Sequence, residues 1–260
     1  MDTGCEQLRA EVDDDGIGLI VFDNPSKHNA MTGEMLGALG RVRAAFAADP
    51  AVRVVVVRGA GDRAFVSGAD IAQLGAGQIP APSPTGGTPE PTGEPVLEKP
   101  SIAMIHGYCL GGGVMIALSA DIRLCSDDAQ FGIPAARLGV GYPHAATSTL
   151  VALVGPGQAS EILFTGRRID AAEAARIGLV NRVVAKDALE AEALTMAREI
   201  ARNAPLSHVA HQRSIRAAVS GRDDDQPGVD VAIRAAWASD DFTEGAAAFL
   251  ERRDPHFHGR

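Results

Sequence analysis

The sequence predicts an α/β fold built on a parallel sheet, followed by a helical C-terminal extension. The apolar run from Ile17 to Phe22 has the residue types of a strand, and the β-branched run from Val52 to Gly59 is typical of a strand covered on both faces. Apolar residues recur at helical spacing between these two runs, and a strand, a helix and a covered strand in this order begin a parallel α/β unit. Helical patterns dominate after Pro143, so we expect a strand-rich core first and helices last.

The later elements follow in order along the chain. After the first strand, the Asp, Asn and Pro residues of DNPSKHNAM predict a sharp connection. Thr32 suits the N-cap of the next helix, which Asp49 and Pro50 end. We expect a third strand at SIAMIHG, a helix from Val114 to Ser119, and a fourth strand at DIRLCS. A short strand from Leu179 to Val184 interrupts the later helical patterns, and the tail from Pro205 onward is helical.

A long segment from Gly75 to Pro95 separates the second and third strands. Proline, glycine, serine and threonine dominate it, so it cannot bury much apolar surface. Within a compact domain, a loop of this length is typical of a lid or a disordered insertion.

Composition excludes several classes of protein. The chain has 260 residues, of which 46% are hydrophobic and 22% charged, as expected of an ordinary globular protein. No apolar run approaches the roughly 20 residues of a membrane span, and the acidic N-terminus does not resemble a secretory signal, so we expect a cytoplasmic protein. The net charge is −9 and no cluster of basic residues is present, which argues against a nucleic-acid partner. The three cysteines lack metal-ligand spacing, so we expect reduced structural thiols and no metal.

Three consecutive glycines, Gly111 to Gly113, stand where the Val114 helix has to begin. Glycine inside a helix costs about 1 kcal/mol relative to alanine, so stability alone would not select them. Backbone amides at a helix start have no intrahelical partner and lie at the positive end of the helix dipole. A negative oxygen that develops during a reaction could therefore bind there, and close packing of strand and helix is the alternative.

A second glycine-containing junction, AFVSGADI from Ala64 to Ile71, follows the Val-rich strand. Ligands of parallel sheets gather at the carboxyl ends of strands, so the two junctions could bring two amides to one point. Two N–H groups donating to one oxygen would form an oxyanion hole.

With these junctions, five motifs in order resemble the crotonase family of enoyl-CoA hydratases and isomerases: NPSKHNAM, AFVSGADI, GYCLGGG, AQFGIP and ASDDFTEGAAAFLERR. The resemblance implies a spiral of ββα units over residues 1–200, and a helical region over residues 201–260 that builds homotrimers or homohexamers. It implies an acyl-CoA thioester as the substrate, with coenzyme A as part of that substrate and no separate cofactor. Phe249 and Arg252 fall where a neighbouring subunit usually reaches the nucleotide.

The resemblance also assigns roles near the two junctions. Ala69 and Gly112 match the family's two oxyanion donors. Lys27 lies where the family often has a basic residue near the CoA phosphates, and Asp70 and Ile71 belong to the loop that meets the adenine. Such local cations matter in an acidic chain, because coenzyme A is strongly negative.

One departure from the family decides the expected reaction. Hydratases of the family use two glutamates, and the matching positions hold Met115 and Ala135, which cannot carry a proton. Addition of water needs a base and an acid, and each contributes roughly 10² to 10⁴ to the rate. Loss of both should therefore lower the rate of hydration by about four to eight decades. Ordinary hydration is therefore disfavoured, and the case for double-bond migration is also weaker. Decarboxylation needs no base to form the enolate, since departing CO₂ leaves its electrons behind.

Three polar side chains remain along the expected wall of the site: Arg137, Tyr142 and His144. We hypothesise that Tyr142 or His144 protonates an enolate. The alternatives are that Tyr142 only lines the wall of the site and that His144 is simply an exposed histidine. For Arg137 we expect a structural ion pair rather than a clamp on a carboxylate. Three other residues are interpreted as structural, namely His106, Cys109 and Asp121.

Competing hypotheses stay open. The segment GAGDRA, from Gly59 to Ala64, fits the G-x-G-x-x-A pattern of dinucleotide folds, but a phosphate loop should open a helix and the next residues do not predict one. A non-catalytic scaffold that binds acyl-CoA without turnover is a second alternative. Hydration by relocated acid and base groups is a third.

Overall fold

The chain begins with a hairpin at one edge of the larger of two sheets. In this computed structural model, which describes residues 1–79, 97–220 and 226–260, β1 (Leu8–Val12) pairs antiparallel with β2 (Ile17–Phe22). The chain then passes through a 3-10 turn, η1 (Pro25–Lys27), and α1 (Gly33–Ala48) into β3 (Val54–Gly59), which runs parallel to β2. The Thr32 hydroxyl accepts a hydrogen bond from the Met35 amide at 3.2 Å, which confirms the predicted N-cap.

Two sheets share the remaining strands. The larger sheet has the order β1-β2-β3-β5-β7-β10 and is completed by β5 (Ser101–Ile105), β7 (Ile122–Ser126) and β10 (Arg182–Val184). The smaller sheet consists of β4 (Ala64–Val66), β6 (Tyr108–Leu110), β8 (Gln130–Gly132) and β9 (Arg168–Asp170), in that order. In three successive passes, a strand of the first sheet is followed by a three-residue strand of the second: β3 then β4, β5 then β6, and β7 then β8. This repetition confirms the predicted spiral.

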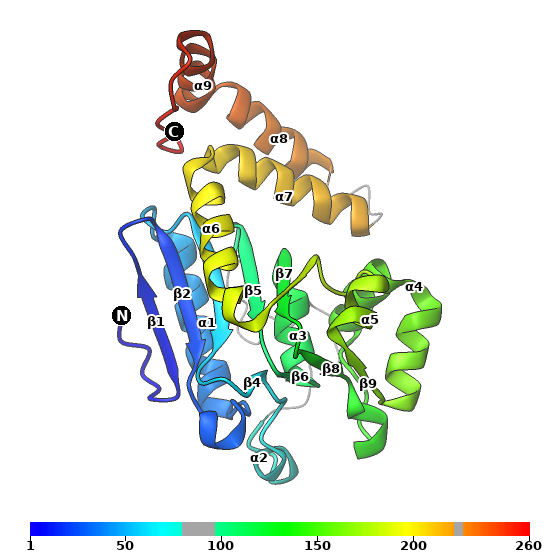
Figure 1. The fold of residues 1–260 in the computed structure, drawn as a ribbon. Helices are drawn as coiled ribbons and strands as arrows, with labels where there is room; N and C mark the ends of the chain where they lie inside the picture. The colour runs from blue at the N-terminus through cyan, green and yellow to red at the C-terminus, as the bar shows by residue number, and fades with distance from the viewer. Residues whose placement is uncertain (80–96, 221–225) are drawn as a thin grey trace.

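Helices close both faces of the sheets and extend beyond them. The helical elements after β4 are α2 (Ile71–Gly75), α3 (Gly112–Ser119), η2 (Pro134–Leu138), α4 (His144–Thr165), α5 (Ala171–Arg176), η3 (Lys186–Ala188), α6 (Leu189–Arg202), α7 (Pro205–Ser220), α8 (Gln226–Trp237) and α9 (Asp240–Glu251). Figure 1 shows α7, α8 and α9 at one end of the molecule and α2 at the other, beside β4. Among the helices described, none is long and apolar enough to span a bilayer.

The hydrophobic core has two parts, one on each face of the larger sheet. Side chains of β3, β5 and β7 pack on one face against α6, through Leu189, Ala193 and Ala197. On the other face a larger cluster joins α1, α3 and the short strands of the second sheet, and its largest buried side chains include Phe22, Phe46, Phe65 and Phe131. Burial on both faces explains the continuous β-branched run of β3.

The structure corrects several element boundaries. The strands β1, β4, β6, β8 and β9 were not predicted, and α3 begins at Gly112 rather than Val114. The strand predicted from Leu179 begins only at Arg182. In the predicted Gly75 to Pro95 loop, Gly75 ends α2, while residues 80–96 lie outside the described residues and the lid interpretation stays a prediction.

Candidate active site

The glycine junction after β6 combines an unusual backbone with close packing. Gly111 has φ 49° and ψ −111°, a backbone conformation that residues with a Cβ rarely adopt. A Cβ on Gly113 would lie 2.0 Å from the carbonyl oxygen of Val66, so α3 can approach β4 only because this residue is glycine. Gly112 is the first residue of α3, and its N–H finds no acceptor in residues 1–79, 97–220 or 226–260.

The second junction, after β4, is held by the backbone of Met31. The Met31 N–H donates to the Gly68 carbonyl at 2.8 Å, and the Asp70 N–H donates to the Met31 carbonyl at 2.8 Å. These bonds flank Ala69 and leave its own N–H turned away from Met31, with no acceptor in the described part of the chain. Gly68 has φ 110°, which allows the turn.

The structure brings the Ala69 and Gly112 amides together. A Cβ placed on Gly112 would lie 3.6 Å from the Ala69 nitrogen, and one placed on Gly68 would lie 3.8 Å from the Gly112 nitrogen. The buried Met31 side chain packs beside Gly112, with its terminal carbon 2.3 Å from where a Cβ on Gly112 would lie. Two unpaired donors at one point can bind a single oxygen. Met31 was not singled out from the sequence, because its contribution is a backbone bridge that no residue pattern reveals.

Tyr142 reaches this junction from the segment before α4. Its hydroxyl donates a hydrogen bond to the Gly111 carbonyl at 3.1 Å, and its ring is half-buried against the core. A phenol is protonated at neutral pH, and burial raises the pKa of Tyr142 further above that range.

Neither of the other two polar candidates contacts the glycine junctions. His144 is exposed at the first position of α4, with its ring Nε2 3.4 Å from the Ser148 hydroxyl. Arg137 was expected in an ion pair, and this was wrong: its guanidinium donates two hydrogen bonds, at 3.1 and 3.2 Å, to the carbonyl of Thr165. Thr165 ends α4, so its carbonyl is one of those that a helix terminus leaves unpaired, and a cation is favourable there.

At the two positions where the resemblance predicts glutamates in a hydratase, the side chains are apolar and half-buried. Met115 lies in the first turns of α3 and Ala135 lies in η2, and both pack against the main core. Neither can exchange a proton. No group of three or more His, Cys, Asp or Glu side chains suitable for a metal ion occurs in the described ranges.

An ion pair stands beside the Ala69 junction. Lys27, whose side chain is 62% exposed, lies 2.7 Å from the buried Asp70 carboxylate. The same carboxylate caps α2 by accepting from the Ala72 and Gln73 amides at 3.0 and 3.3 Å. The hydrogen bond from Lys27, followed by those from the backbone, lowers the pKa of Asp70. Ile71, the first residue of α2, is exposed.

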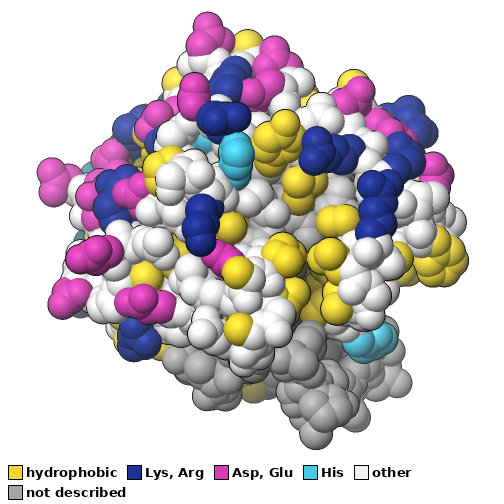
Figure 2. Space-filling view, turned by 90° about the horizontal axis from the view of Figure 1, so that it is seen from below, with side chains coloured by type: hydrophobic (Ala, Val, Ile, Leu, Met, Phe, Trp, Pro, Cys, Tyr) yellow, Lys and Arg dark blue, Asp and Glu magenta, His cyan; other side chains and the backbone are white. Residues whose placement is uncertain are grey.

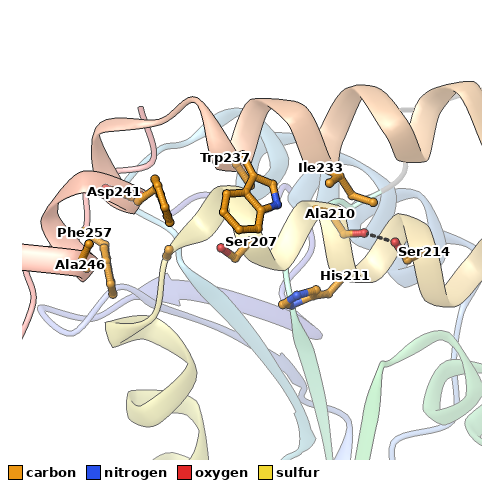
Figure 3. Close-up of a pocket in the computed structure, with 13 residues that line it drawn as sticks. Ser207, Ala210, His211, Ser214, Ile233, Trp237, Asp241, Ala246 and Phe257 are labelled. Carbon is orange, nitrogen blue, oxygen red and sulfur yellow. Dashed lines mark hydrogen bonds between the residues drawn. The ribbon is translucent and has the colours of Figure 1, made fainter. Parts of the chain in front are cut away.

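Phe249 and Arg252 are not brought to this site within one chain. Both lie at the end of α9, where Phe249 is 84% exposed and Arg252 takes a left-handed conformation that ends the helix. Figure 1 places α9 at the opposite end of the molecule from α2. A cleft of about 610 Å³ lies there between α7, α8 and α9, with Trp237 and His211 in its wall (Figure 3). It holds none of the predicted site residues.

The face that carries α2 is hollowed. Figure 2 shows hydrophobic side chains gathered around this hollow and Lys and Arg side chains on the surface near it. An apolar recess with cations close by suits a ligand that has an apolar part and a negative part.

The three residues interpreted as structural have structural surroundings. His106 and Cys109 are buried, and burial lowers the pKa of the first and raises that of the second. The Asp121 carboxylate accepts hydrogen bonds from Ser101 and from Gln212 of α7. The GAGDRA segment joins β3 to β4 and opens no helix, so it lacks the geometry of a dinucleotide loop.

Comparison with known proteins gives consistent similarities over nearly the whole chain. A family profile described as enoyl-CoA hydratase/isomerase matches residues 13–260. Carnitinyl-CoA dehydratases of Citrobacter koseri and Proteus mirabilis are 36% and 37% identical, each over 93% of this chain and 94% of the relative. A solved enoyl-CoA hydratase/carnithine racemase of Magnetospirillum magneticum superimposes with a TM-score of 0.86 and 31% identity, over 98% of this chain and 97% of that one. An enoyl-CoA hydratase of Mycobacterium tuberculosis H37Rv gives a TM-score of 0.87 and 28% identity, over 98% and 99%.

Proposed function

The chain belongs to the enoyl-CoA hydratase/isomerase family, and on that premise we propose that it is an enzyme that acts on an acyl-CoA thioester through an enolate. The observation that carries the proposal is the pair of unpaired amides at Ala69 and Gly112. The thioester carbonyl oxygen accepts from both amides and becomes more negative as the enolate forms. Each such donor contributes about 10² to 10³ in rate.

The reaction type follows from what the site lacks. Met115 and Ala135 supply neither acid nor base, so reactions that need both are disfavoured. Decarboxylation fits best: the bond to the carboxylate carbon breaks, its electron pair enters the thioester enolate, and the α-carbon then takes one proton. Isomerisation of a double bond needs one group that both removes and returns a proton, and it ranks second.

The proton has two candidate sources, His144 and Tyr142. The Tyr142 hydroxyl already donates to the Gly111 carbonyl, whereas the His144 ring is exposed and makes no hydrogen bond to the glycine junctions. We therefore assign protonation of the enolate to His144.

Coenzyme A is held partly by this chain and partly by a neighbouring subunit. Lys27 faces the phosphates and the Asp70 and Ile71 loop meets the adenine, while Phe249 and Arg252 come from the neighbour. Exposed apolar side chains on α8 and α9, among them Trp237 and Leu250, support assembly as a homotrimer or homohexamer.

A second candidate is dehydration of a 3-hydroxyacyl-CoA, because the carnitinyl-CoA dehydratases are similar to nearly the whole chain. Dehydration is hydration reversed and has the same need for an acid and a base, so these groups would have to come from other positions. A scaffold that binds acyl-CoA without turnover remains the non-catalytic alternative.

Turnover of a thioester panel, followed by mass spectrometry, tests the proposal. The panel contains methylmalonyl-CoA, a 3-enoyl-CoA, crotonyl-CoA, carnitinyl-CoA and a saturated acyl-CoA. We expect loss of CO₂, or migration of the double bond, and we expect Gly112→Pro to abolish it because proline has no N–H. An alkyl-CoA thioether, which lacks the carbonyl oxygen, should bind the unaltered protein more weakly than the matching thioester.

Each alternative has its own outcome in this experiment. Fast hydration of crotonyl-CoA or dehydration of carnitinyl-CoA would contradict the argument from Met115 and Ala135. Binding without turnover of any thioester would favour the non-catalytic scaffold. Equal binding of thioester and thioether would contradict the role of the two amides.

A further inference from the structure

The hydrogen bond from Tyr142 ends on the peptide group that carries one of the two oxyanion donors. The hydroxyl donates to the carbonyl oxygen of Gly111 at 3.1 Å, and the nitrogen of the same peptide group belongs to Gly112. A trans peptide group is planar, and its C=O and N–H point in opposite directions. Tyr142 therefore contacts the carbonyl end of the peptide group that carries the Gly112 N–H, close to the Ala69 amide.

We propose that Tyr142 is a positioning residue, which orients and polarises the Gly111–Gly112 peptide so that the Gly112 N–H donates more strongly to a thioester oxygen. This inference rests on the proposed function, since it needs an acyl-CoA carbonyl at the two amides. It differs from a proton-donor role, because the hydroxyl acts through the peptide and never transfers its proton to the substrate.

The glycine junction needs such a restraint. The α3 side of this peptide is closely packed, but its Gly111 side is open, because a Cβ on Gly111 would find no atom closer than 4.0 Å. The Gly111 N–H donates to the Gly132 carbonyl at 2.8 Å, which fixes the preceding peptide. The Gly111 carbonyl accepts one backbone bond, a longer one of 3.2 Å from the Met115 N–H. Tyr142 supplies the second bond to this oxygen and ties the junction to the segment before α4.

Polarisation follows from the resonance of the amide. A donor at the carbonyl oxygen draws electrons toward it, which makes the N–H of the same group more positive. Hydrogen bonds in such chains strengthen one another by about 10–30% per bond. Because a phenol is protonated at neutral pH, and burial raises the pKa of Tyr142 further, the hydroxyl can donate throughout the neutral pH range.

The test is the carbonyl stretching band of a bound thioester labelled with ¹³C at its carbonyl, measured by infrared difference spectroscopy. Binding to the unaltered protein should shift the band to lower frequency, because the two amides polarise the carbonyl. In Tyr142→Phe, which keeps the ring and loses the hydroxyl, we expect part of this shift to be lost. We also expect kcat to fall about 2- to 10-fold, as loss of one hydrogen bond predicts, with KM nearly unchanged.

The chain offers a matched control, because Tyr108 is its only other tyrosine. Tyr108→Phe should leave the band and kcat unchanged. In that background, fluorotyrosine incorporated biosynthetically occupies position 142 alone. Its more acidic hydroxyl is a stronger donor, so the band should move further to low frequency, opposite to the effect of Tyr142→Phe. This opposite shift keeps the proposal testable even if Tyr142→Phe folds poorly.

The outcomes separate this inference from the proposed function. A full shift in Tyr142→Phe, together with loss of the shift in Gly112→Pro, would overturn the positioning role and leave the oxyanion hole intact. An unchanged band in Tyr142→Phe with complete loss of deuterium exchange at the α-carbon would show that Tyr142 transfers the proton itself. No shift in the unaltered protein would overturn both proposals.

Discussion

His144 is the side chain on which the proposed proton transfer depends. It stands exposed at the start of α4, next to the Tyr142 segment that contacts the glycine junction. We expect His144→Gln to reduce kcat by about 10² to 10⁴, the usual contribution of a general acid, and to slow deuterium incorporation at the α-carbon to the same extent. The matched control is His256→Gln, an exposed histidine near the C-terminus, which should leave both rates unchanged. Equal rates in His144→Gln and the unaltered protein would mean that solvent delivers the proton.

The ion pair between Lys27 and Asp70 makes local stability depend on pH. The pKa of Asp70 is lowered in the folded protein, chiefly by its hydrogen bond from Lys27, so the unfolded chain binds this proton more tightly. The stabilisation is therefore complete at neutral pH and is lost as the pH falls from the ordinary aspartate range through the lowered pKa. We expect Asp70→Asn, which keeps the cap of α2, to melt at a lower temperature than the unaltered protein at pH 7.

The sign of this effect is checked by repeating the melts at lower pH. The difference in melting temperature between Asp70→Asn and the unaltered protein should shrink as the pH falls toward 3. Asp14→Asn, at an exposed position in the β1–β2 turn, serves as the control and should show a smaller difference at pH 7. A difference for Asp70→Asn that stays constant from pH 7 to pH 3 would contradict the assignment.

At the scale of elements, the contact between α3 and β4 sets the geometry of the glycine junction. A Cβ on Gly113 would lie 2.0 Å from the Val66 carbonyl oxygen, which is backbone and cannot move aside cheaply. We expect Gly113→Ala to destabilise the protein by about 1–3 kcal/mol or more, as overpacking does, measured by urea unfolding. In Gly37→Ala, on α1, the new Cβ would approach the Arg41 guanidinium no closer than 3.6 Å, so this control should gain about 0.5–1 kcal/mol. Loss of stability in both variants would point to a general intolerance of the fold rather than to this contact.

The sequence predicted β3 and α1 and missed the short strands β4, β6 and β8 for a physical reason. A strand such as β3 shows a continuous apolar run, and α1 shows a cap, a period and a stop, so both were found. The three-residue strands β4, β6 and β8 are too short to show any period, and their pairing with one another is decided by the spiral. Their existence is a property of tertiary structure.

The candidate site was predictable to the same degree. The glycines at Gly111 to Gly113 drew attention because helix propensity disfavours them, and the resemblance then selected Ala69 and Gly112. The Met31 bridge and the Tyr142 hydrogen bond involve residues distant in sequence, joined through backbone atoms. Arg137 was misjudged because its acceptor is a helix-terminal carbonyl, which no charge pattern marks.

At the scale of the whole molecule, the proposed function requires a second chain to complete the site. The predicted CoA contacts Phe249 and Arg252 lie at the end of α9, far from α2, so the proposed function assigns them to the site of a neighbouring subunit (Figure 1). Assembly should therefore raise the affinity for the coenzyme, although the residues that hold the subunits together differ from those that contact the nucleotide. Leu250, next to Phe249, is 80% exposed and has no assigned role toward the nucleotide. A substitution at Leu250 should therefore disturb assembly without removing a nucleotide contact.

We expect light scattering to show three or six chains per particle in the unaltered protein, and single chains in Leu250→Glu, because a buried unpaired carboxylate opposes association. The dissociated variant should also bind acyl-CoA more weakly, since each site loses its neighbour. Arg252→Ala should keep the assembly and lose affinity for acyl-CoA while keeping affinity for a short acyl-pantetheine thioester, which has no nucleotide. If Leu250→Glu were monomeric with unchanged acyl-CoA affinity, the coenzyme would be bound by one chain alone, and Phe249 and Arg252 would have no role in the site.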